Sequence, residues 1–334
     1  MIKNSFNYLI IFVFIIVNVN LIKSKEYVFE DPEDKVQIFA PGFISTGMDE
    51  RDIAISPDKK NILFSRVFNR KINIIMIIEK NKDGWSNPDV ASFSGKYKDI
   101  EPAFTPDGKK LFFASNRPLK NEDKPGDFNI WYVKKEKNGW GKPICLNENV
   151  NTEKNEFYPS ISKSGNLYYT CGYDGSLGKE DIYLSRLKNG KYQKRENLGK
   201  NINSKYFEFN AFIDPDEKYI IFTSYGRKDG MGKGDLYISF KDKNNNWTKA
   251  VNMGPEINTA ESLEYCPFVS FDKKSFFFTS NRFLYKKLYT KKLNYEEIKA
   301  IINSPGNGNK DIYWINAEII DKLYKASTVT SPKK

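Results

Sequence analysis

The feature that most constrains the fold is a unit of about fifty residues that recurs five times along the chain. Each copy joins a short apolar stretch to a longer one through a tight turn, with the turn residues Asp58, Asp107, Ser164, Asp216 and Asp272 spaced 49, 57, 52 and 56 positions apart. The copies are ERDIAISPDKKNILFSR (50–66), DIEPAFTPDGKKLFFASNR (99–117), EFYPSISKSGNLYYTCG (156–172), EFNAFIDPDEKYIIFTSYGR (208–227) and EYCPFVSFDKKSFFFTSNR (264–282). A fixed period of this length indicates an array of similar structural units.

Each part of the unit favours β structure. Pro106-Asp107-Gly108 suits a tight turn, because Pro presets φ, Asp bonds its own backbone and Gly accepts a positive φ. Apolar runs such as 111–113 have no polar face, as in strands that are covered on both sides. A third strand follows, for example DIYLS at 181–185, and we expect a fourth to begin near Trp85, Trp140, Tyr192 and Trp247.

Four short strands in each of five units predict an all-β protein, a β-propeller of five blades with four antiparallel strands each. The fifth unit lacks a fourth strand, whereas residues 36–41 resemble the end of a blade. We therefore expect this N-terminal strand to complete blade five and close the ring, which removes the sheet edges that an open ring exposes. Six blades are the alternative if 283–310 hides a degenerate unit, although 294–304 has helical spacing.

The N-terminus predicts export. A lysine precedes an apolar run at 8–17, as in a secretory signal peptide. The run is shorter than the roughly 20 apolar residues that a membrane span needs. We expect residues 1–24 to be a signal peptide, 25–320 a single propeller domain and 321–334 a polar C-terminal tail. The protein is then periplasmic or secreted, with no stable membrane span after signal cleavage, and an uncleaved anchor is the alternative.

Composition excludes several classes of function. The net charge is +11, but the lysines are scattered, so we interpret them as a solvated surface and predict no nucleic-acid partner. The chain has no His, which excludes His general bases, His-containing triads and His metal sites. Its three Cys stand at irregular spacing and predict no disulfide framework. No catalytic residue and no metal ligand set is predicted.

The repeat resembles a known family. The Pro-Asp-Gly turn, the apolar triplet, the Ser-Asn-Arg ending and the Asp-Ile-Tyr strand are similar to the TolB-type, WD-like β-propeller repeat of the Pro-Asp kind, over residues 36–320. The linker INTAESLE (257–264) and the Gly-Trp pairs look like those of envelope-associated bacterial members. The resemblance implies an exported bacterial propeller that binds proteins or glycans. It implies no single activity, since propellers serve many functions.

One acid stands eight positions before each turn residue. These acids are Glu50, Asp99, Glu156, Glu208 and Glu264. Because the first strand of a propeller blade lines the central channel, the five carboxylates are a candidate ligand site at one channel mouth, for a cation or a basic partner loop. The alternative is structural, with each acid capping a strand or pairing with an Arg such as Arg117, since a feature present once per blade generally builds the blade.

The aspartates that open the third strand have two interpretations. Asp181, Asp235 and Asp311 follow loops rich in Gly. Their side chains are expected to bond the loop backbone. Calcium is the alternative, although neither 173–181 nor 227–235 has the EF-hand spacing. No cofactor is therefore expected, with calcium as the open possibility.

These patterns predict a non-enzymatic, exported propeller that binds an envelope or extracellular protein or glycan through its loop face. The candidate loops are those that break the repeat, at 118–128, 173–180, 228–234 and 283–310. The alternative is a carboxylate-dependent glycan hydrolase or lyase at the channel mouth. That activity would need two non-repeat acids about 5–10 Å apart in a pocket.

Overall fold

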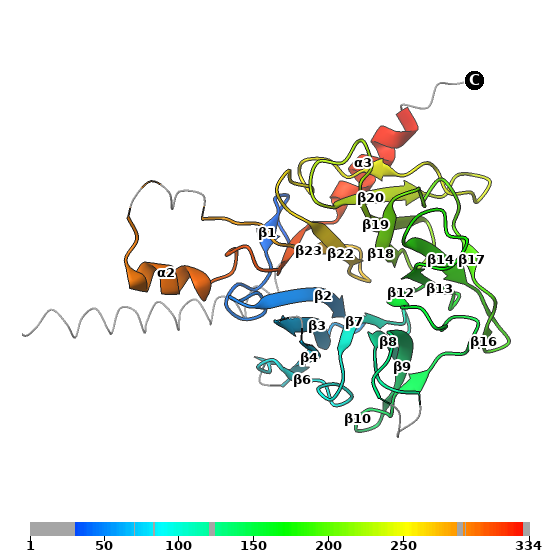
Figure 1. Cartoon of the computed structure of the whole chain (residues 1–334), viewed down its shortest axis with the longest axis horizontal. Helices are drawn as coiled ribbons and strands as arrows, with labels where there is room; N and C mark the ends of the chain where they lie inside the picture. The colour runs from blue at the N-terminus through cyan, green and yellow to red at the C-terminus, as the bar shows by residue number, and fades with distance from the viewer. Residues whose placement is uncertain are drawn as a thin grey trace, which may run out of the picture.

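The chain folds into a ring of five antiparallel sheets, each a blade of four strands (Figure 1). The computed structural model describes residues 31–69, 71–82, 84–119, 124–285, 290 and 292–329. This topology confirms the all-β, five-bladed propeller. The six-bladed alternative is wrong, because the described residues within 283–310 add a helix and no blade. The expected signal peptide at 1–24 lies outside the described residues.

The first three blades each carry small accessory strands at the outer edge. Blade one contains β2 (Asp49–Ile55), β3 (Asn61–Phe68), β4 (Ile72–Asn81) and β6 (Asp89–Val90), with β5 (Gly84–Trp85) beside β4. Blade two contains β7 (Asp99–Phe104), β8 (Lys110–Ser115), β9 (Asn129–Glu136) and β11 (Ile144–Cys145), with β10 (Gly139–Trp140) beside β9. Blade three contains β12 (Phe157–Ile161), β13 (Leu167–Cys171), β14 (Asp181–Ser185) and β17 (Glu196–Asn197), with the hairpin β15 (Leu187–Lys188) and β16 (Lys191–Tyr192).

The last two blades have four strands each. Blade four contains β18 (Phe207–Ile213), β19 (Tyr219–Tyr225), β20 (Asp235–Phe240) and β21 (Val251–Asn252). Blade five contains β22 (Glu264–Val269), β23 (Ser275–Ser280), β24 (Asp311–Asn316) and β1 (Gln37–Ile38). In each of the first four blades the fourth strand begins a few residues later than predicted. The aromatic residues near which these strands were expected to begin belong mostly to accessory strands or turns.

The N-terminal strand closes the ring as predicted. β1 pairs antiparallel with β24, with Gln37 opposite Trp314, and the amide of Phe39 donates to Ile312 O at 2.8 Å. The Phe39 side chain is fully buried between Phe277 and Trp314, whose ring centroids lie 5.1 and 5.0 Å away. Strands from the two ends of the described chain thus form one blade, which leaves the third strand of blade five without an open edge.

The inner strands are buried on both faces, which explains their unbroken apolar runs. All five residues of β13 and of β14 are buried, as are all six of β20. Neighbouring blades pack face to face through aromatic rings, such as Phe212 against Phe268 at 5.8 Å. The core therefore consists mainly of layers between blades, with a small cluster of Tyr158, Tyr265 and Cys266 at the ring centre.

Each linker between blades binds the blade that it leaves. In the linker after blade three, Asn203 accepts a hydrogen bond from Ile182 N at 2.8 Å and donates one to Ile182 O at 2.9 Å, which clamps β14. The same clamp recurs as Asn151 on Ile130, Asn258 on Leu236 and, in the N-terminal segment, Ser45 on Ile312. The recurring INT-type linker is thus a structural device that fixes the order and spacing of the blades.

Among the described residues, two helices lie outside the blades. α2 (Tyr295–Ile302) confirms the helical excursion expected within 283–310, and Asn294 and Glu297 form a reciprocal capping box at its start. α3 (Glu318–Val329) follows β24, with Ile319 and Ile320 buried, so the stretch expected to form a polar tail begins inside a helix. Along the described chain, neither helix has the length and apolar character needed to cross a bilayer.

The ring closure makes a quantitative prediction. Replacing Phe39 with Ala should lower the free energy of unfolding by about 3–5 kcal/mol, because a fully buried ring between two aromatics is removed. Phe68→Ala is the matched control, since that side chain is largely exposed and its loss should change stability by no more than about 0.5 kcal/mol. Urea unfolding followed by tryptophan fluorescence measures both, and equal effects would contradict closure by β1.

Candidate functional site

The five repeated acids are the first candidate site, and the structure buries all of them. Glu50, Asp99, Glu156, Glu208 and Glu264 have no solvent-exposed surface. Each carboxylate lies in its own blade and is bonded to the linker that precedes it. None of the five lines the central cavity described below.

Blade four illustrates the geometry. Glu208 accepts hydrogen bonds from the amide and the hydroxyl of Ser204 in the linker, both at 2.7 Å, and from the Ser224 hydroxyl of β19, also at 2.7 Å. Arg227 Nε donates to the same carboxylate at 3.1 Å, and its Nη2 donates to Ile202 O in the linker. One buried anion therefore joins the linker, the first strand and the end of the second strand. Arg66, Arg117 and Arg282 pair with the acids of their own blades.

Blade three keeps this arrangement with a different donor. It has no Arg after its second strand, and Tyr173 takes that place. The Tyr173 hydroxyl lies 3.0 Å from Glu156 Oε1 and donates to Val150 O of the linker at 2.8 Å. A neutral hydroxyl thus stands where the other blades have a guanidinium. Its single hydrogen serves the acid or the linker, whereas the guanidinium donates to both.

Burial governs the protonation of these acids. It raises the pKa of Glu50, Asp99, Glu156 and Glu264, while hydrogen bonds from each linker and, where present, the Arg partly oppose the shift. A cation or a partner loop would reach any of the five only if its linker opened. The geometry agrees with the structural interpretation of these acids, and their role as ligand-binding residues stays a prediction.

A second set of five residues lies closer to the ring centre. Each stands two positions after the acid, at a register shift in the innermost strand. All five have positive φ although none is Gly: Asp52 (61°), Glu101 (62°), Tyr158 (50°), Asn210 (50°) and Cys266 (54°). We call them the central pentad. A bulge with left-handed backbone in every blade turns these residues out of the regular strand, which costs conformational energy that the surrounding contacts must offset.

The backbone of the pentad connects neighbouring blades. The amides of Asp52, Glu101 and Asn210 donate to hydroxyls on the second strand of the preceding blade, which are Thr279, Ser65 and Thr170 at 3.4, 3.0 and 3.0 Å. In blade two that position is Ala114, which has no hydroxyl. The amide of Tyr158 instead donates to Glu101 Oε2 at 2.6 Å, so the Glu101 carboxylate replaces the missing hydroxyl.

Four side chains of the pentad form one polar network with Arg51, whereas the Tyr158 hydroxyl donates to Pro267 O at 2.9 Å. Arg51 donates through Nε to Asp52 at 2.6 Å and through Nη2 to Glu101 Oε1 at 2.7 Å. Asn210 Nδ2 lies 3.2 Å from Glu101 Oε1 and 3.4 Å from the Cys266 sulfur. One guanidinium thus faces two buried carboxylates, so one proton makes the cluster neutral. Burial raises the pKa of Glu101 to about 7, with Arg51 opposing the shift and Asp52 adding to it.

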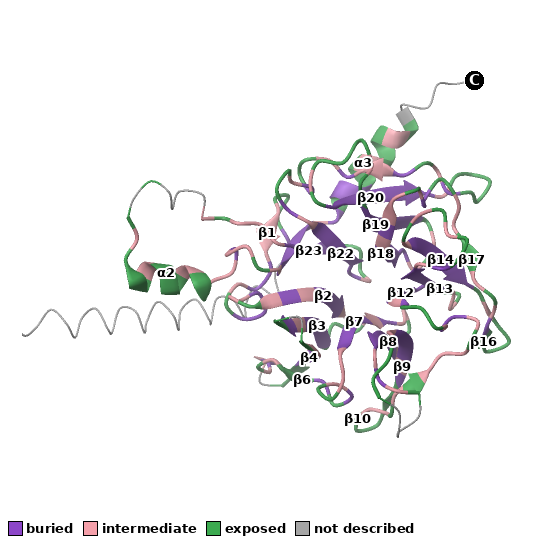
Figure 2. Cartoon of the chain, viewed as in Figure 1, coloured by how far each residue is buried: buried purple, intermediate pink, exposed green. Residues whose placement is uncertain are grey.

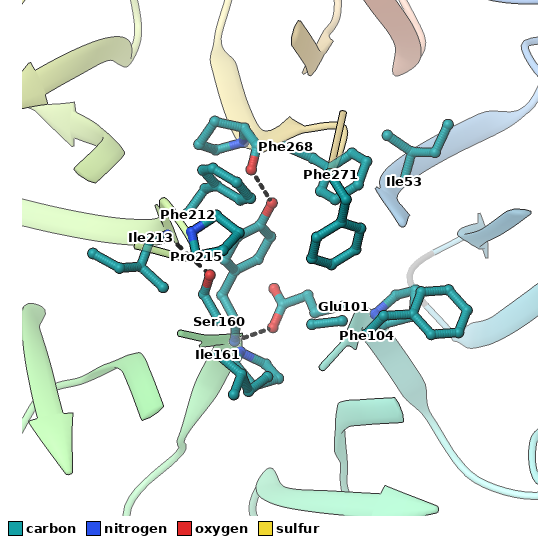
Figure 3. A pocket seen from close by; sticks show the side chains of 15 residues that line it. Ile53, Glu101, Phe104, Ser160, Ile161, Phe212, Ile213, Pro215, Phe268 and Phe271 are labelled. Carbon is teal, nitrogen blue, oxygen red and sulfur yellow. Dashed lines mark hydrogen bonds between the residues drawn. The ribbon is translucent and has the colours of Figure 1, made fainter. Parts of the chain in front are cut away.

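The central cavity beside the pentad is small. Figure 3 shows Phe212, Phe268 and Phe271 converging on it from one side and Glu101 from another. Its volume is about 30 Å³, which is room for one or two water molecules and not for a sugar ring. Two non-repeat acids, Asp52 and Glu101, do converge, but they converge on Arg51, inside a region that aromatic side chains fill.

The third-strand aspartates hold their loops, as the structural interpretation expects. Asp181 accepts from the amides of Leu177 and Gly178 at 2.6 and 3.0 Å, and Asp311 accepts from Gly306 N at 2.7 Å. Asp235 does the same for its loop through Gly232 N at 3.0 Å. These bonds agree with the structural interpretation, and calcium at these aspartates stays an open prediction. Within the part of the chain that the structure describes, no three His, Cys, Asp or Glu side chains are grouped as a metal site would require.

One face of the ring carries most of the exposed apolar side chains. Strands alternate in direction, so the loops between second and third strands share an end of the ring with the linkers, and backbone bonds such as Lys179 N to Tyr206 O at 2.8 Å connect them. We call this end the loop face. Eleven of the fourteen exposed large apolar residues of the described chain belong to these linkers and loops or to the strand ends beside them, and the last three of them lie on α2, which projects from the ring: Met48, Phe68, Ile72, Leu119, Leu177, Tyr225, Met231, Leu284, Tyr295, Ile298 and Ile302. Figure 2 shows exposed segments at the rim of the ring and buried strands within it.

Sequence reasoning found the acids and the loops but missed the pentad. Its members differ in every blade, so no motif marks them. The signal that could have found them is the alignment itself, because the residue two positions after the acid is Asp, Glu, Tyr, Asn or Cys in a strand that otherwise repeats. Arg51 was missed for the same reason, since the other blades have Ile100, Phe157, Phe209 or Tyr265 there.

Comparison with known proteins gives similarity in overall fold only. No protein-family model and no curated protein matches the sequence. Among solved structures, a protein of Agrobacterium tumefaciens assigned as TolB is 16% identical with a TM-score of 0.46, over 70% of each chain. TolB of Acinetobacter baumannii is 14% identical with a TM-score of 0.44, over 80% of this chain and 54% of that one. A Dyadobacter fermentans protein of unknown function is 13% identical with a TM-score of 0.48, over 84% of this chain and 98% of that one. The fold description rests on the sheet topology itself.

The buried acid–arginine pairs predict unequal costs of mutation. Arg117→Met should lower the free energy of unfolding by about 3–5 kcal/mol, because Asp99 is left buried without its cation. Arg186→Met is the matched control, since its pair with Glu196 is exposed and is worth less than about 1 kcal/mol. Urea unfolding of both variants measures the difference, and similar losses would show that Asp99 does not depend on Arg117.

Glu101 predicts a pH dependence with a defined sign. Its folded pKa of about 7 lies above the usual value of 4.5, so its contribution to stability is fully present below about pH 4.5 and is lost as pH rises through 7. Glu101→Gln should therefore gain stability relative to the wild type between pH 5 and 8, by up to about 1.4 kcal/mol per pH unit. The measurement is the difference in urea unfolding free energy at several pH values, in which the other acids cancel. A difference that does not change with pH would contradict the assignment.

Proposed function

We propose that this protein is an exported propeller that binds a protein partner on its loop face and catalyses no reaction. The observation that carries the proposal is the concentration of exposed Leu, Ile, Met, Phe and Tyr side chains on that face. Aromatic residues and Met are enriched in protein interfaces, and these side chains are presented by neighbouring loops of the ring. A glycan site would instead require polar side chains that converge in a pocket.

The interior of the ring supports the same proposal. The repeated acids bond their own linkers, and Asp52 and Glu101 bond Arg51, so these carboxylates already have partners within the blades. A central cavity of about 30 Å³ leaves no room for a sugar substrate at the centre of the ring. The competing function is a glycan hydrolase or lyase. Asp52 and Glu101 would be its pair of carboxylates, and the central cavity would have to open to admit the glycan. Export rests on the apolar N-terminal segment of the sequence.

The test compares variants of the loop face. Leu177→Asn combined with Met231→Asn changes two exposed apolar residues in the loops of blades three and four. Ile144→Asn combined with Val90→Asn changes two equally exposed residues on outer strands and serves as the matched control. We expect chemical cross-linking in envelope extract to capture a defined protein with the wild type and the control, and at least about tenfold less of it with the loop variant.

Two results would contradict the proposal. One is equal capture by the loop variant and the control, which would remove the loop face as the binding surface. The other is turnover of an envelope or plant polysaccharide by the purified protein that Glu101→Gln abolishes, which would favour the hydrolase or lyase.

A further inference from the structure

The excursion of blade five differs from the other loops in how it leaves the ring. Its base is fixed, because Phe283 and Asn307 form an antiparallel bridge and Leu284 N donates to Gly306 O at 2.9 Å. Asn307 and Asn309 both donate to Gly47 O in the N-terminal linker, at 3.1 and 2.9 Å. Beyond this base, α2 stands away from the ring on the side of β1 and β2 (Figure 1).

α2 has an apolar face that the ring does not cover. None of its residues is buried, and Tyr295, Ile298 and Ile302 are exposed by 74%, 42% and 59%. Their spacing of three and four positions places them on one side of the helix. A helix of eight residues is marginal in water without packing, because nucleation is costly. Its capping box alone offsets little of that cost, so a partner surface is expected to stabilise it.

The charges of α2 are sorted around this face. At 100° per residue, Glu296 and Glu297 project from the side opposite Ile298 and Ile302, whereas Lys299 lies next to Tyr295 at the edge of the apolar face. A helix that lies on a surface with its apolar side down would thus point its acids away from that surface. Lysines at the edge of such a face extend their charges toward the surface.

The sequence of the excursion adds a second argument. Residues 283–302 contain five Lys and two Glu, a net charge of +3, interleaved with Leu, Ile, Phe and Tyr. Apolar and aromatic residues combined with lysines are typical of segments that bind the interface of an anionic membrane. A protein interface would more often deplete lysine.

We propose that α2 docks the propeller on an anionic lipid surface, with Tyr295, Ile298 and Ile302 inserted at the level of the headgroups. Two contributions add: burial of the apolar face and attraction of the lysines to acidic headgroups. The contact is peripheral and crosses no bilayer. It would hold the ring at a membrane independently of the protein partner proposed for the loops of the other blades.

The experiment is vesicle co-sedimentation of the protein in the form that the cell produces. We expect binding to phosphatidylcholine vesicles that contain phosphatidylglycerol to exceed binding to pure phosphatidylcholine by at least about tenfold at about 0.1 M salt. That excess should fall at about 1 M salt, where the Debye length shortens from about 10 Å to about 3 Å.

Two variants separate the contributions. Ile298→Asn combined with Ile302→Asn should reduce binding to anionic vesicles by at least about tenfold, and Lys292→Gln combined with Lys299→Gln by about tenfold on anionic vesicles only. Ile144→Asn combined with Val90→Asn is the matched control and should bind as the wild type does. All of these side chains are exposed, so the melting temperatures should agree within a few degrees and verify the fold.

The outcomes that would overturn the proposal are specific. Wild-type protein that binds neither vesicle, or both equally, contradicts an anionic lipid surface. Undiminished binding after the isoleucine substitutions contradicts α2 as the docking element. A wild-type dimer in gel filtration that the isoleucine substitutions convert to a monomer would show that a second copy of the chain covers this face.

Discussion

The buried carboxylate that opens each blade is the interaction on which the structure depends. An ionised carboxylate without solvent is costly unless several donors reach it. Around Glu208 those donors come from the linker, from β19 and from Arg227, so three segments must assemble together for the acid to be tolerated. The same requirement in every blade fixes the distance between consecutive sheets. It also explains why the linker motif recurs as faithfully as the strands.

This dependence explains how much of the fold could be predicted from sequence. Features that every blade needs recur in the sequence, so the number of blades, the inner strands and the closure by residues 36–41 could all be predicted. Of the features found in one blade only, α2 was predicted from the helical spacing of 294–304, whereas α3 was not. α3 was missed because its apolar residues Ile319 and Ile320 follow β24 directly and read as part of a strand. The sequence predicted the outer strands a few residues too early, because a strand of two residues is too short to show an alternating pattern of apolar and polar residues.

The centre of the ring shows the opposite combination, a repeated backbone with unrepeated side chains. Every blade contributes one left-handed residue, but its type changes with the local need. Glu101 illustrates this, because its carboxylate accepts a hydrogen bond from the Tyr158 amide at the place where Ala114 has no hydroxyl to accept it. Arg51 then compensates Asp52 and Glu101 together. Such dependences join residues about 50 positions apart, and a motif search along one blade cannot detect them, whereas the packed structure displays them directly.

The division between repeated and unrepeated parts of the chain also indicates which surface can bind a partner. The polar groups described in the interior form hydrogen bonds that hold the blades together. The surface that a partner can contact is therefore that of the loops. Those loops can vary because Asp181, Asp235 and Asp311 hold the backbone at their ends, next to the third strand. Changes in the length and composition of a loop beyond its aspartate therefore do not disturb the strands of the blade. Blade five has the longest of these loops, with a helix of its own. Among the described residues, the most exposed large apolar side chain, Tyr295, lies on that helix.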